Sequence, residues 1–130
     1  MSGKKAVLII TDGTEKVTAM AEKIAKTLRG SRVLIKEASG FAGTDLLPAE
    51  VVFIGCSEPS PPCFGYLYEL LQHINLAGRK CGVFSPSSKK ALQYLKGMLK
   101  SCEITLNPTQ MTEANSAETE NWTASVFSDN

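Results

Sequence analysis

The stretch "AVLII" at residues 6–10, followed by "TDGT" at residues 11–14, decides the fold. An apolar run of five residues without polar alternation is typical of a strand that is buried on both faces of a sheet. Beyond the turn, apolar side chains recur at steps of three and four: Val17, Met20, Ala21, Ile24 and Leu28. This spacing puts them on one face of a helix, so the chain is predicted to open with a strand, a tight turn and an amphipathic helix over residues 14–28.

The same alternation continues along the chain. Further apolar runs occur at residues 33–35, 51–54, 81–84 and, more weakly, 104–106. Helical spacing separates them at residues 64–74, where Gly78 is expected to end the helix, and at residues 91–99. The short stretch 38–50 has room for one helical turn around Asp45 and Leu46. Because strands that alternate with helices form a parallel sheet covered on both faces, we predict a three-layer α/β/α sandwich.

The end of the chain differs in composition from the rest. Residues 1–108 are expected to form the α/β domain, and residues 109–130 a polar, acidic tail. Within the tail, residues 117–127 form either a short final helix on the same domain or a frayed end rich in Ser, Thr, Asn and Glu. We favour the helix, which would be anchored by Trp122, Val126 and Phe127.

Composition and charge exclude several classes of protein. With 130 residues, 43% apolar and 21% charged, the chain suits one compact globular domain. No apolar run reaches the length of a membrane helix, and no secretory signal is visible, so we expect a cytoplasmic protein without a membrane partner. All 14 basic residues lie within residues 1–100, but they are scattered. Nucleic-acid binding needs a clustered basic stripe, so a nucleic-acid partner is not expected.

The cysteines and the single histidine offer little metal or hydrolytic chemistry. Cys56, Cys63, Cys81 and Cys102 form no CxxC pair, and His73 is the one histidine, so we predict no metal site and no Ser-His-Asp hydrolase. Cys63 is expected to open a helix, whose dipole would lower the pKa of its thiol. A thiol switch at Cys56 and Cys63 therefore stays open, although we favour small apolar fillers. His73 is expected at the surface or its boundary.

Ligands of parallel α/β sheets bind beyond the carboxyl ends of the strands. Three loops follow strands at that edge: residues 11–14, 56–63 and 85–90. The second of them contains three prolines, which restrict the residues before them to extended conformations and stiffen the loop. A rigid loop at this edge suits the binding of a planar ring.

In element order and spacing, residues 4–106 resemble the flavodoxins. The resemblance is carried by "KKAVLIITDGTEKV" at residues 4–17, "AEVVFIGCSEPSPPCFGYLYELL" at residues 49–71 and "LAGRKCGVFSPSS" at residues 76–88. It implies a five-stranded sheet of order 2-1-3-4-5 that holds FMN noncovalently at its carboxyl edge. It also implies electron transfer to a redox protein partner, or a small FMN-dependent oxidoreductase, rather than a hydrolase.

The resemblance also implies which residues contact FMN. The hydroxyl-rich loop Ser/Thr-x-Thr-Gly-x-Thr binds the phosphate at a helix N-terminus, and the loops after the third and fourth strands enclose the ring. The residues at the matching positions are Thr11, Asp12, Gly13, Thr14, Ser57, Glu58, Pro59, Ser60, Ser85, Ser87 and Ser88. Thr14 would in addition cap the helix that follows, and Ser87 and Ser88 are ordinary residues for a second helix cap.

Several features depart from the family pattern. If Thr14 is the last threonine of the motif, the phosphate loop is about two residues short, and Asp12 brings a negative charge to the place of a phosphate. Residues 85–90 contain no aromatic side chain, where flavodoxins have a tyrosine. Phe64 or Tyr66 would stack on a flavin, but both also fit the buried stripe of the next helix, which we favour. Electron-transfer flavodoxins are strongly acidic, whereas this body is mildly basic.

Two functions therefore remain open. The first is an FMN-binding, flavodoxin-like electron carrier, with "TDGT" as the phosphate loop. The second is a flavodoxin-like domain that has lost flavin binding and serves as a binding or regulatory module, with "TDGT" as an Asp-Gly turn before a helix. The hydroxyls, the glycine and the Pro-rich loop at the strand ends favour the first, which is our working hypothesis.

Overall fold

The computed structural model describes residues 5–28, 30–86, 88–112 and 118–128. Its strands are β1 (Ala6–Thr11), β2 (Arg32–Glu37), β3 (Val51–Gly55), β4 (Lys80–Phe84) and β5 (Thr105–Leu106). Its α-helices are α1 (Glu15–Lys26), α2 (Gly43–Leu46), α3 (Gly65–Leu71), α4 (Lys89–Met98) and α5 (Thr119–Ser128). In the described residues, the 3-10 helix η1 (Pro62–Phe64) precedes α3 and the 3-10 helix η2 (Lys100–Cys102) follows α4.

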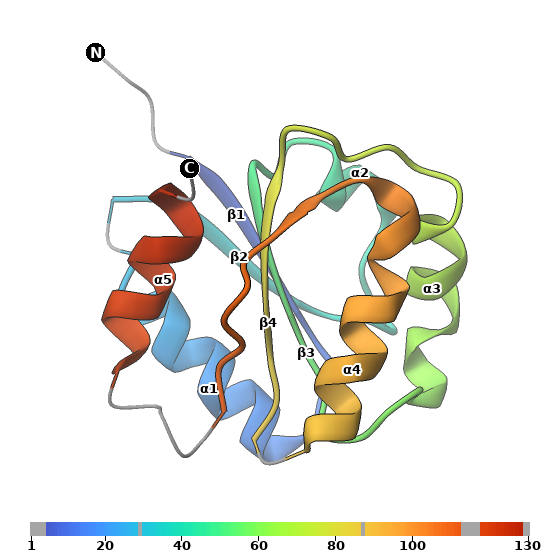
Figure 1. The fold of residues 1–130 in the computed structure, drawn as a ribbon, viewed down its shortest axis with the longest axis horizontal. Helices are drawn as coiled ribbons and strands as arrows, with labels where there is room; N and C mark the ends of the chain where they lie inside the picture. Colours follow the sequence, from blue (N-terminus) through green and yellow to red (C-terminus); the bar gives the residue numbers. More distant parts are fainter. Residues whose placement is uncertain (1–4, 29, 87, 113–117, 129–130) are drawn as a thin grey trace.

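The five strands form one parallel sheet of order β2-β1-β3-β4-β5. The sheet lies between two layers of helices, with α1 and α5 on one face and α3 and α4 on the other (Figure 1). The predicted three-layer sandwich and its strand order are therefore confirmed. β5 is only two residues long, and the chain beyond it returns to β4, where Met111 makes a parallel bridge with Phe84.

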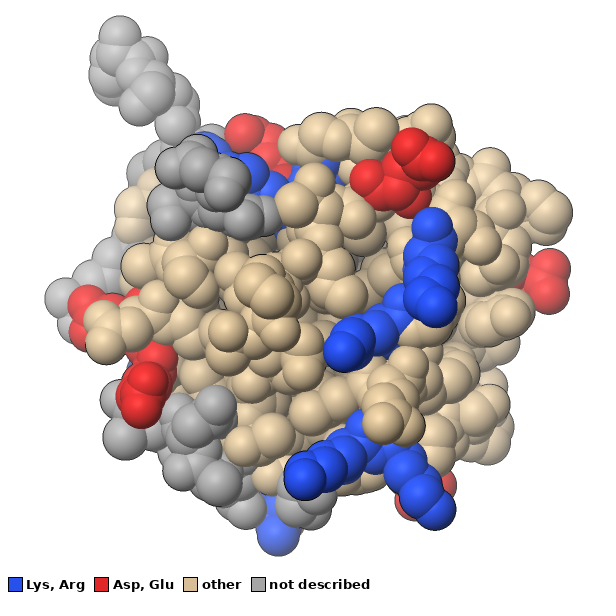
Figure 2. Space-filling view, viewed as in Figure 1, with Lys and Arg blue, Asp and Glu red and all other residues tan. Residues whose placement is uncertain are grey.

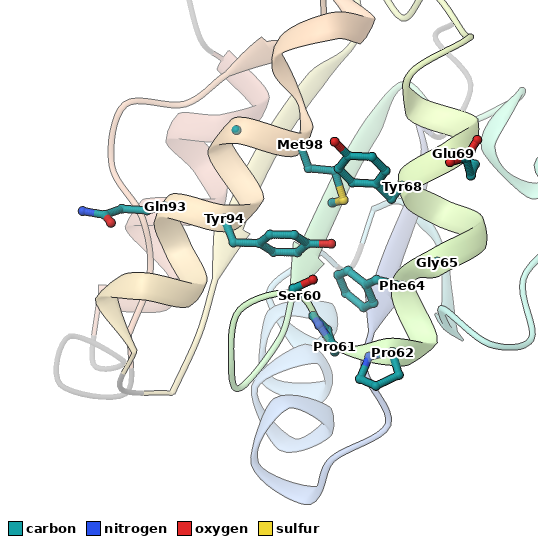
Figure 3. A pocket seen from close by; sticks show the side chains of 11 residues that line it. Ser60, Pro61, Pro62, Phe64, Gly65, Tyr68, Glu69, Gln93, Tyr94 and Met98 are labelled. Atoms are coloured by element: carbon teal, nitrogen blue, oxygen red, sulfur yellow. The ribbon is translucent and has the colours of Figure 1, made fainter.

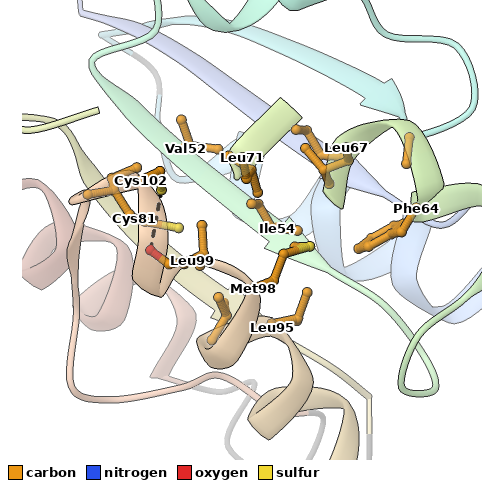
Figure 4. Close-up of a cluster of buried hydrophobic side chains, with 14 of the residues drawn as sticks. Val52, Ile54, Phe64, Leu67, Leu71, Cys81, Leu95, Met98, Leu99 and Cys102 are labelled. Carbon is orange, nitrogen blue, oxygen red and sulfur yellow. Dashed lines mark hydrogen bonds between the residues drawn. The ribbon is translucent and has the colours of Figure 1, made fainter. Parts of the chain in front are cut away.

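Alternate side chains of the central strands build two cores. In β1, Val7 and Ile9 pack under α1 and α5, whereas Leu8 and Ile10 pack under α3 and α4. Figure 4 shows the second core, in which side chains of β3 and β4 meet those of α3 and α4. Strands buried on both faces need continuous apolar sequence, which explains why the apolar runs predicted the strands so well.

The helices follow the predicted spacing, with one correction. In α1, the predicted apolar stripe is buried, and α4 buries its stripe in the same way. α2 is the single turn expected around Asp45 and Leu46. α3, however, ends at Leu71, well before Gly78. Gly78 has a φ of +87° and serves the turn into β4 instead, so it was wrong to expect it to end α3. His73 is exposed just beyond α3, as predicted.

α5 covers the sheet beside α1. Trp122 and Val126 are buried against β3 and β4, and the Trp122 ring lies 5.4 Å from that of Phe53. Gly82 in β4 makes room for it, because a Cβ at that position would lie 2.8 Å from the Trp122 ring. The final helix that we favoured for residues 117–127 is therefore present over Thr119–Ser128. Residues 113–117 of the tail lie outside the described residues.

The carboxyl ends of β1, β3 and β4 meet at one edge of the sheet, which brings together the three loops singled out above. Among the residues that the structure describes, none belongs to a helix that is long and apolar enough to span a bilayer.

Candidate functional site

The corner between β1 and α1 is organised around the carboxylate of Asp12. Its Oδ1 accepts hydrogen bonds from the backbone N–H and the hydroxyl of Thr14, at 3.0 and 2.6 Å. Its Oδ2 accepts from the backbone N–H and the hydroxyl of Ser57, at 2.8 and 3.0 Å. Asp12 thus joins the loop after β1 to the loop after β3, and both of its oxygens are fully engaged.

The rest of the TDGT segment completes a tight turn. The buried hydroxyl of Thr11 accepts a hydrogen bond from the N–H of Gly13 at 3.2 Å. Gly13 has a φ of +81°, which favours glycine, and a Cβ there would lie 2.9 Å from a carboxylate oxygen of Glu37 at the end of β2. The carboxylate of Glu37 therefore places a second negative charge next to the turn.

Thr14 does not cap α1 with its side chain, contrary to our expectation. It occupies the N-cap position, but its side chain makes no capping hydrogen bond to the first turn of the helix. Its hydroxyl instead donates to the ionised Asp12 at 2.6 Å, and this bond holds the side chain at the turn before the helix.

These hydrogen bonds keep Asp12 ionised. Burial by itself raises the pKa of the Asp12 carboxyl, but the hydrogen bonds from Thr14 and Ser57 outweigh it and leave the pKa below its ordinary value. At neutral pH the corner therefore contains its own fixed anion.

The loop after β3 is tied down at one end and exposed in the middle. Ser57 binds Asp12, whereas Glu58, Pro59 and Ser60 are exposed. Ser60 has a φ of +52°, although it precedes Pro61, so the expectation that prolines would keep the preceding residues extended is wrong at this position.

The two described serines of the loop after β4 have different roles. Ser88 is the N-cap of α4, and its hydroxyl accepts a hydrogen bond from the N–H of Ala91 at 3.0 Å, which confirms the expected cap. Ser85 is buried, its N–H donates to the carbonyl of Met111 at 3.0 Å, and its hydroxyl has no partner among the described residues. Ser87 lies outside the described residues.

The two aromatic residues considered for stacking on a flavin both make other contacts. Phe64 is entirely buried in the core between the sheet and α3, as favoured above. Tyr66 is about half exposed rather than part of the buried stripe. Its ring lies 5.5 Å from that of Phe41, and its hydroxyl accepts a hydrogen bond from the N–H of Gly43 at the start of α2.

The cysteines of this edge are not activated. Burial and the nearby Asp12 carboxylate raise the pKa of the Cys63 thiol, so the expected lowering by a helix dipole is wrong. Cys63 lies within η1, and its Sγ donates to the carbonyl of Asp12 at 3.7 Å. Burial, followed by the charge of Asp12, raises the pKa of Cys56 to about 12. Apolar filling is the role that these environments favour for both thiols. The described residues contain no cluster of His, Cys, Asp or Glu suited to a metal ion.

The donors at the corner do not fit a phosphate group as they stand. The N–H and hydroxyl groups of Thr14 and Ser57 already bind Asp12, and the N–H of Gly13 already binds Thr11. A phosphate would have to displace the Asp12 carboxylate and would then face Glu37. Of the groups assigned to the ring, only the hydroxyl of Ser85 is buried without a partner in the described part of the chain.

A cleft lies beside this edge, between α3 and α4. It has a volume of about 740 Å³ and is lined by Ser60, Pro61, Pro62, Phe64, Gly65, Tyr68, Glu69, Gln93, Tyr94, Gly97 and Met98. Figure 3 shows Tyr68 and Tyr94 pointing into the gap from the two helices, with Met98 between them. Sequence reasoning missed this cleft, because it considered only the loops at the carboxyl ends of the strands as ligand sites. The signal available was a Tyr and a Gly near one another in each helix.

The likeness of this fold to known proteins is found in structure and not in sequence. No family model matches the chain, and no curated protein matches it in sequence. Among solved structures, it is similar to a flavodoxin of Streptococcus pneumoniae TIGR4, with a TM-score of 0.80 and 18% identity over 96% of this chain and 99% of the other. Oxidised flavodoxin 2 from Bacillus cereus gives a TM-score of 0.82 with 17% identity, covering 96% and 99% of the two chains. A mutant flavodoxin of Fusobacterium nucleatum bound to flavin mononucleotide gives 0.80 with 9% identity, covering 99% of each chain.

Proposed function

We propose that this chain, whose fold is that of the flavodoxins, is a binding module in which the carboxylate of Asp12 takes the place of a ligand phosphate. The observation that carries the proposal is the engagement of both Asp12 oxygens by Thr14 and Ser57. In a phosphate loop, backbone N–H groups and hydroxyls are left for the ligand. Here the chain supplies the anion itself, and the loop becomes a fastening between β1 and β3.

The charge of the surroundings supports this interpretation. Glu37 lies against Gly13, and the carboxylates of Asp12 and Glu37 both raise the pKa of the nearby Cys63. An acidic corner disfavours a phosphate dianion on electrostatic grounds alone. The position of Tyr66 against α2 and the absence of aromatic residues from positions 85–90 weigh in the same direction, because they leave no obvious stacking partner for a flavin.

The rival function is the FMN-binding electron carrier of our working hypothesis, with a redox protein as its partner. Two observations favour it. The likeness to flavodoxins extends over almost the whole of both chains, including one bound to flavin mononucleotide. The buried hydroxyl of Ser85 at the end of β4 also has no partner among the described residues. Under this function, FMN would release Thr14 and Ser57 from Asp12 on binding.

An FMN titration decides between the two. We expect the purified chain to be colourless and to leave FMN fluorescence unchanged up to high micromolar concentrations. Replacing Asp12 by Gly removes the internal anion and should raise the affinity for FMN by about tenfold or more, whereas the charge-matched control Asp45→Asn should not. Saturable quenching at one FMN per wild-type chain, weakened by Thr14→Glu, would instead establish the electron carrier.

A further inference from the structure

We propose that the cleft between α3 and α4 binds a small molecule that carries both an aryl ring and an anionic group. This inference deepens the proposed binding function, but it stands on residues outside the Asp12 corner. The volume of about 740 Å³ lies in the range of small-molecule sites, and the cleft adjoins the exposed part of the loop after β3.

The walls of the cleft suit a flat ring. Tyr68 on α3 is 42% exposed, and Tyr94 on α4 projects toward it across the gap. Phe64 lies deeper, with its ring 6.4 Å from that of Tyr94, and Met98 is buried beside it. Aromatic faces and a polarisable thioether contribute stacking energy to an inserted aryl group.

Two glycines leave open space in the cleft, and close packing of the fold requires neither of them. Gly65 lies at the start of α3, and Gly97 lies inside α4. A Cβ added at either position would meet no atom within 4 Å, so neither glycine serves close packing. Glycine inside a helix destabilises the helix relative to alanine. What the two glycines provide is open space between the helices, which is what a ligand requires.

The rim holds a strained residue. Ser60, with its φ of +52°, lines the cleft together with Tyr94. A left-handed backbone is strained at a residue other than glycine and persists where the surroundings fix it. Such strained residues cluster at ligand-binding sites, which supports a binding role for this rim.

The charge of the rim selects an anion. Lys89, Lys90, Lys96 and Lys100 are all exposed along α4, and none forms an ion pair with a described carboxylate. Figure 2 shows basic side chains gathered along this side of the molecule. Lys90 precedes Tyr94 by four residues, so helix geometry places it next to a side chain that points into the gap. On the opposite helix the lining contains one carboxylate, that of Glu69.

The test uses an aryl anion as the probe. We expect 8-anilinonaphthalene-1-sulfonate to bind the full chain at one molecule per chain, with enhanced fluorescence, and 1-naphthoate to displace it. 1-Naphthalenemethanol, which has the same ring and no charge, should displace it about threefold or more less well. Replacing Gly97 by Leu fills the cleft and should weaken both anions about tenfold or more, while the melting temperature stays equal or rises.

Matched variants separate the cleft from general effects. Gly30→Leu also adds a side chain where a Cβ would meet no atom, but outside the cleft, and should leave binding unchanged. Lys90→Glu should weaken 1-naphthoate about threefold, whereas Lys23→Glu on α1 should not. Unchanged binding in Gly97→Leu, equal loss in Gly30→Leu, or equal displacement by the neutral alcohol would overturn the proposal. FMN bound at the Asp12 corner would overturn the proposed function but leave the effect of Gly97→Leu in place, so the two failures are distinguishable.

Discussion

At the scale of the residue, Asp12 shows how one carboxylate changes the use of a whole loop. Its two oxygens accept hydrogen bonds from two loops, and the more distant donor, Ser57, lies 45 residues from Asp12 in the sequence. An ionised acceptor makes stronger hydrogen bonds than a neutral one, so the corner is held more firmly than an ordinary turn. The same bonds that stiffen the corner withdraw it from any anionic ligand.

The pKa of Asp12 leads to a prediction about acid stability. Because the pKa is lower in the folded than in the unfolded chain, ionised Asp12 stabilises the fold above its unfolded pKa, near 4, and this contribution is lost as the pH falls through the lower folded pKa. We expect Asp12→Asn to lower the free energy of unfolding at pH 7 by about 1 to 2 kcal/mol, toward the low end because the side chain is partly exposed.

Urea unfolding from pH 7 down to pH 3 measures this effect. The difference between wild type and Asp12→Asn should shrink as the pH falls below about 4, because the unfolded chain gains its proton there before the folded chain does. Asp45→Asn serves as the control for loss of one negative charge. A difference that stays constant over the whole range would show that the charge of Asp12 contributes nothing to the corner.

At the scale of the element, α1 and α4 begin differently although both follow a strand of the same sheet. α4 has a side-chain cap, Ser88, whereas Thr14 before α1 is diverted to Asp12. At Thr14 the hydrogen bond to Asp12 holds the side chain, and its oxygen accepts no bond from the first turn of α1. Both positions match the sequence pattern of a cap, but only one makes the bond.

We therefore expect the replacement of Ser88 by alanine to destabilise the protein by about 1 kcal/mol, because the N–H of Ala91 loses its acceptor. Thermal or urea unfolding followed by far-UV circular dichroism gives the value. Ser88→Asp retains an acceptor at the same place and should recover most of the loss. If the aspartate variant is no more stable than the alanine variant, the hydroxyl of Ser88 is not an effective cap.

At the scale of the whole molecule, the two helical layers are built from different parts of the chain. The layer of α3 and α4 is built from consecutive strand-helix units, whereas α1 shares its face with α5, which returns from the end of the chain. The hydroxyls of Thr27 and Thr123 lie 2.8 Å apart, and the ammonium of Lys80 donates to the carbonyl of Phe127 at 2.7 Å. α5 is thus fastened to both α1 and β4.

Truncation after residue 112 should expose the face of the sheet that Trp122 and Val126 cover. The loss of Trp122 alone corresponds to about 3 to 5 kcal/mol of unfolding free energy. We expect the shortened chain to unfold at much lower urea concentration, as measured by circular dichroism, and a chain that ends at residue 128 to match the wild type. Equal stability of the chain that ends at residue 112 would contradict the packing role of α5.

The sequence by itself determined the elements of this protein and their layers. Every predicted strand, the single turn of α2, the helices α1 and α4 and the final helix were found where they were expected, and the strand order is the one that the resemblance to the flavodoxins implied. The physical reason is that a strand or helix buried on one or both faces needs apolar residues at a characteristic spacing, and this spacing involves only residues that are close in the sequence. The cap at Ser88 was predictable for the same reason, since donor and acceptor lie three residues apart.

Only the tertiary structure decided the chemistry of the edge. The partners of Asp12, the raised pKa of Cys63, the packing of Tyr66 on Phe41 and the cleft between Gly65 and Gly97 all join residues that are far apart in the sequence. Such contacts have no periodic signature, because each depends on how complete elements pack. The fold could therefore be predicted from the sequence. The choice between an open phosphate loop and a closed corner depended on which acceptor the tertiary structure places against the N–H and hydroxyl donors.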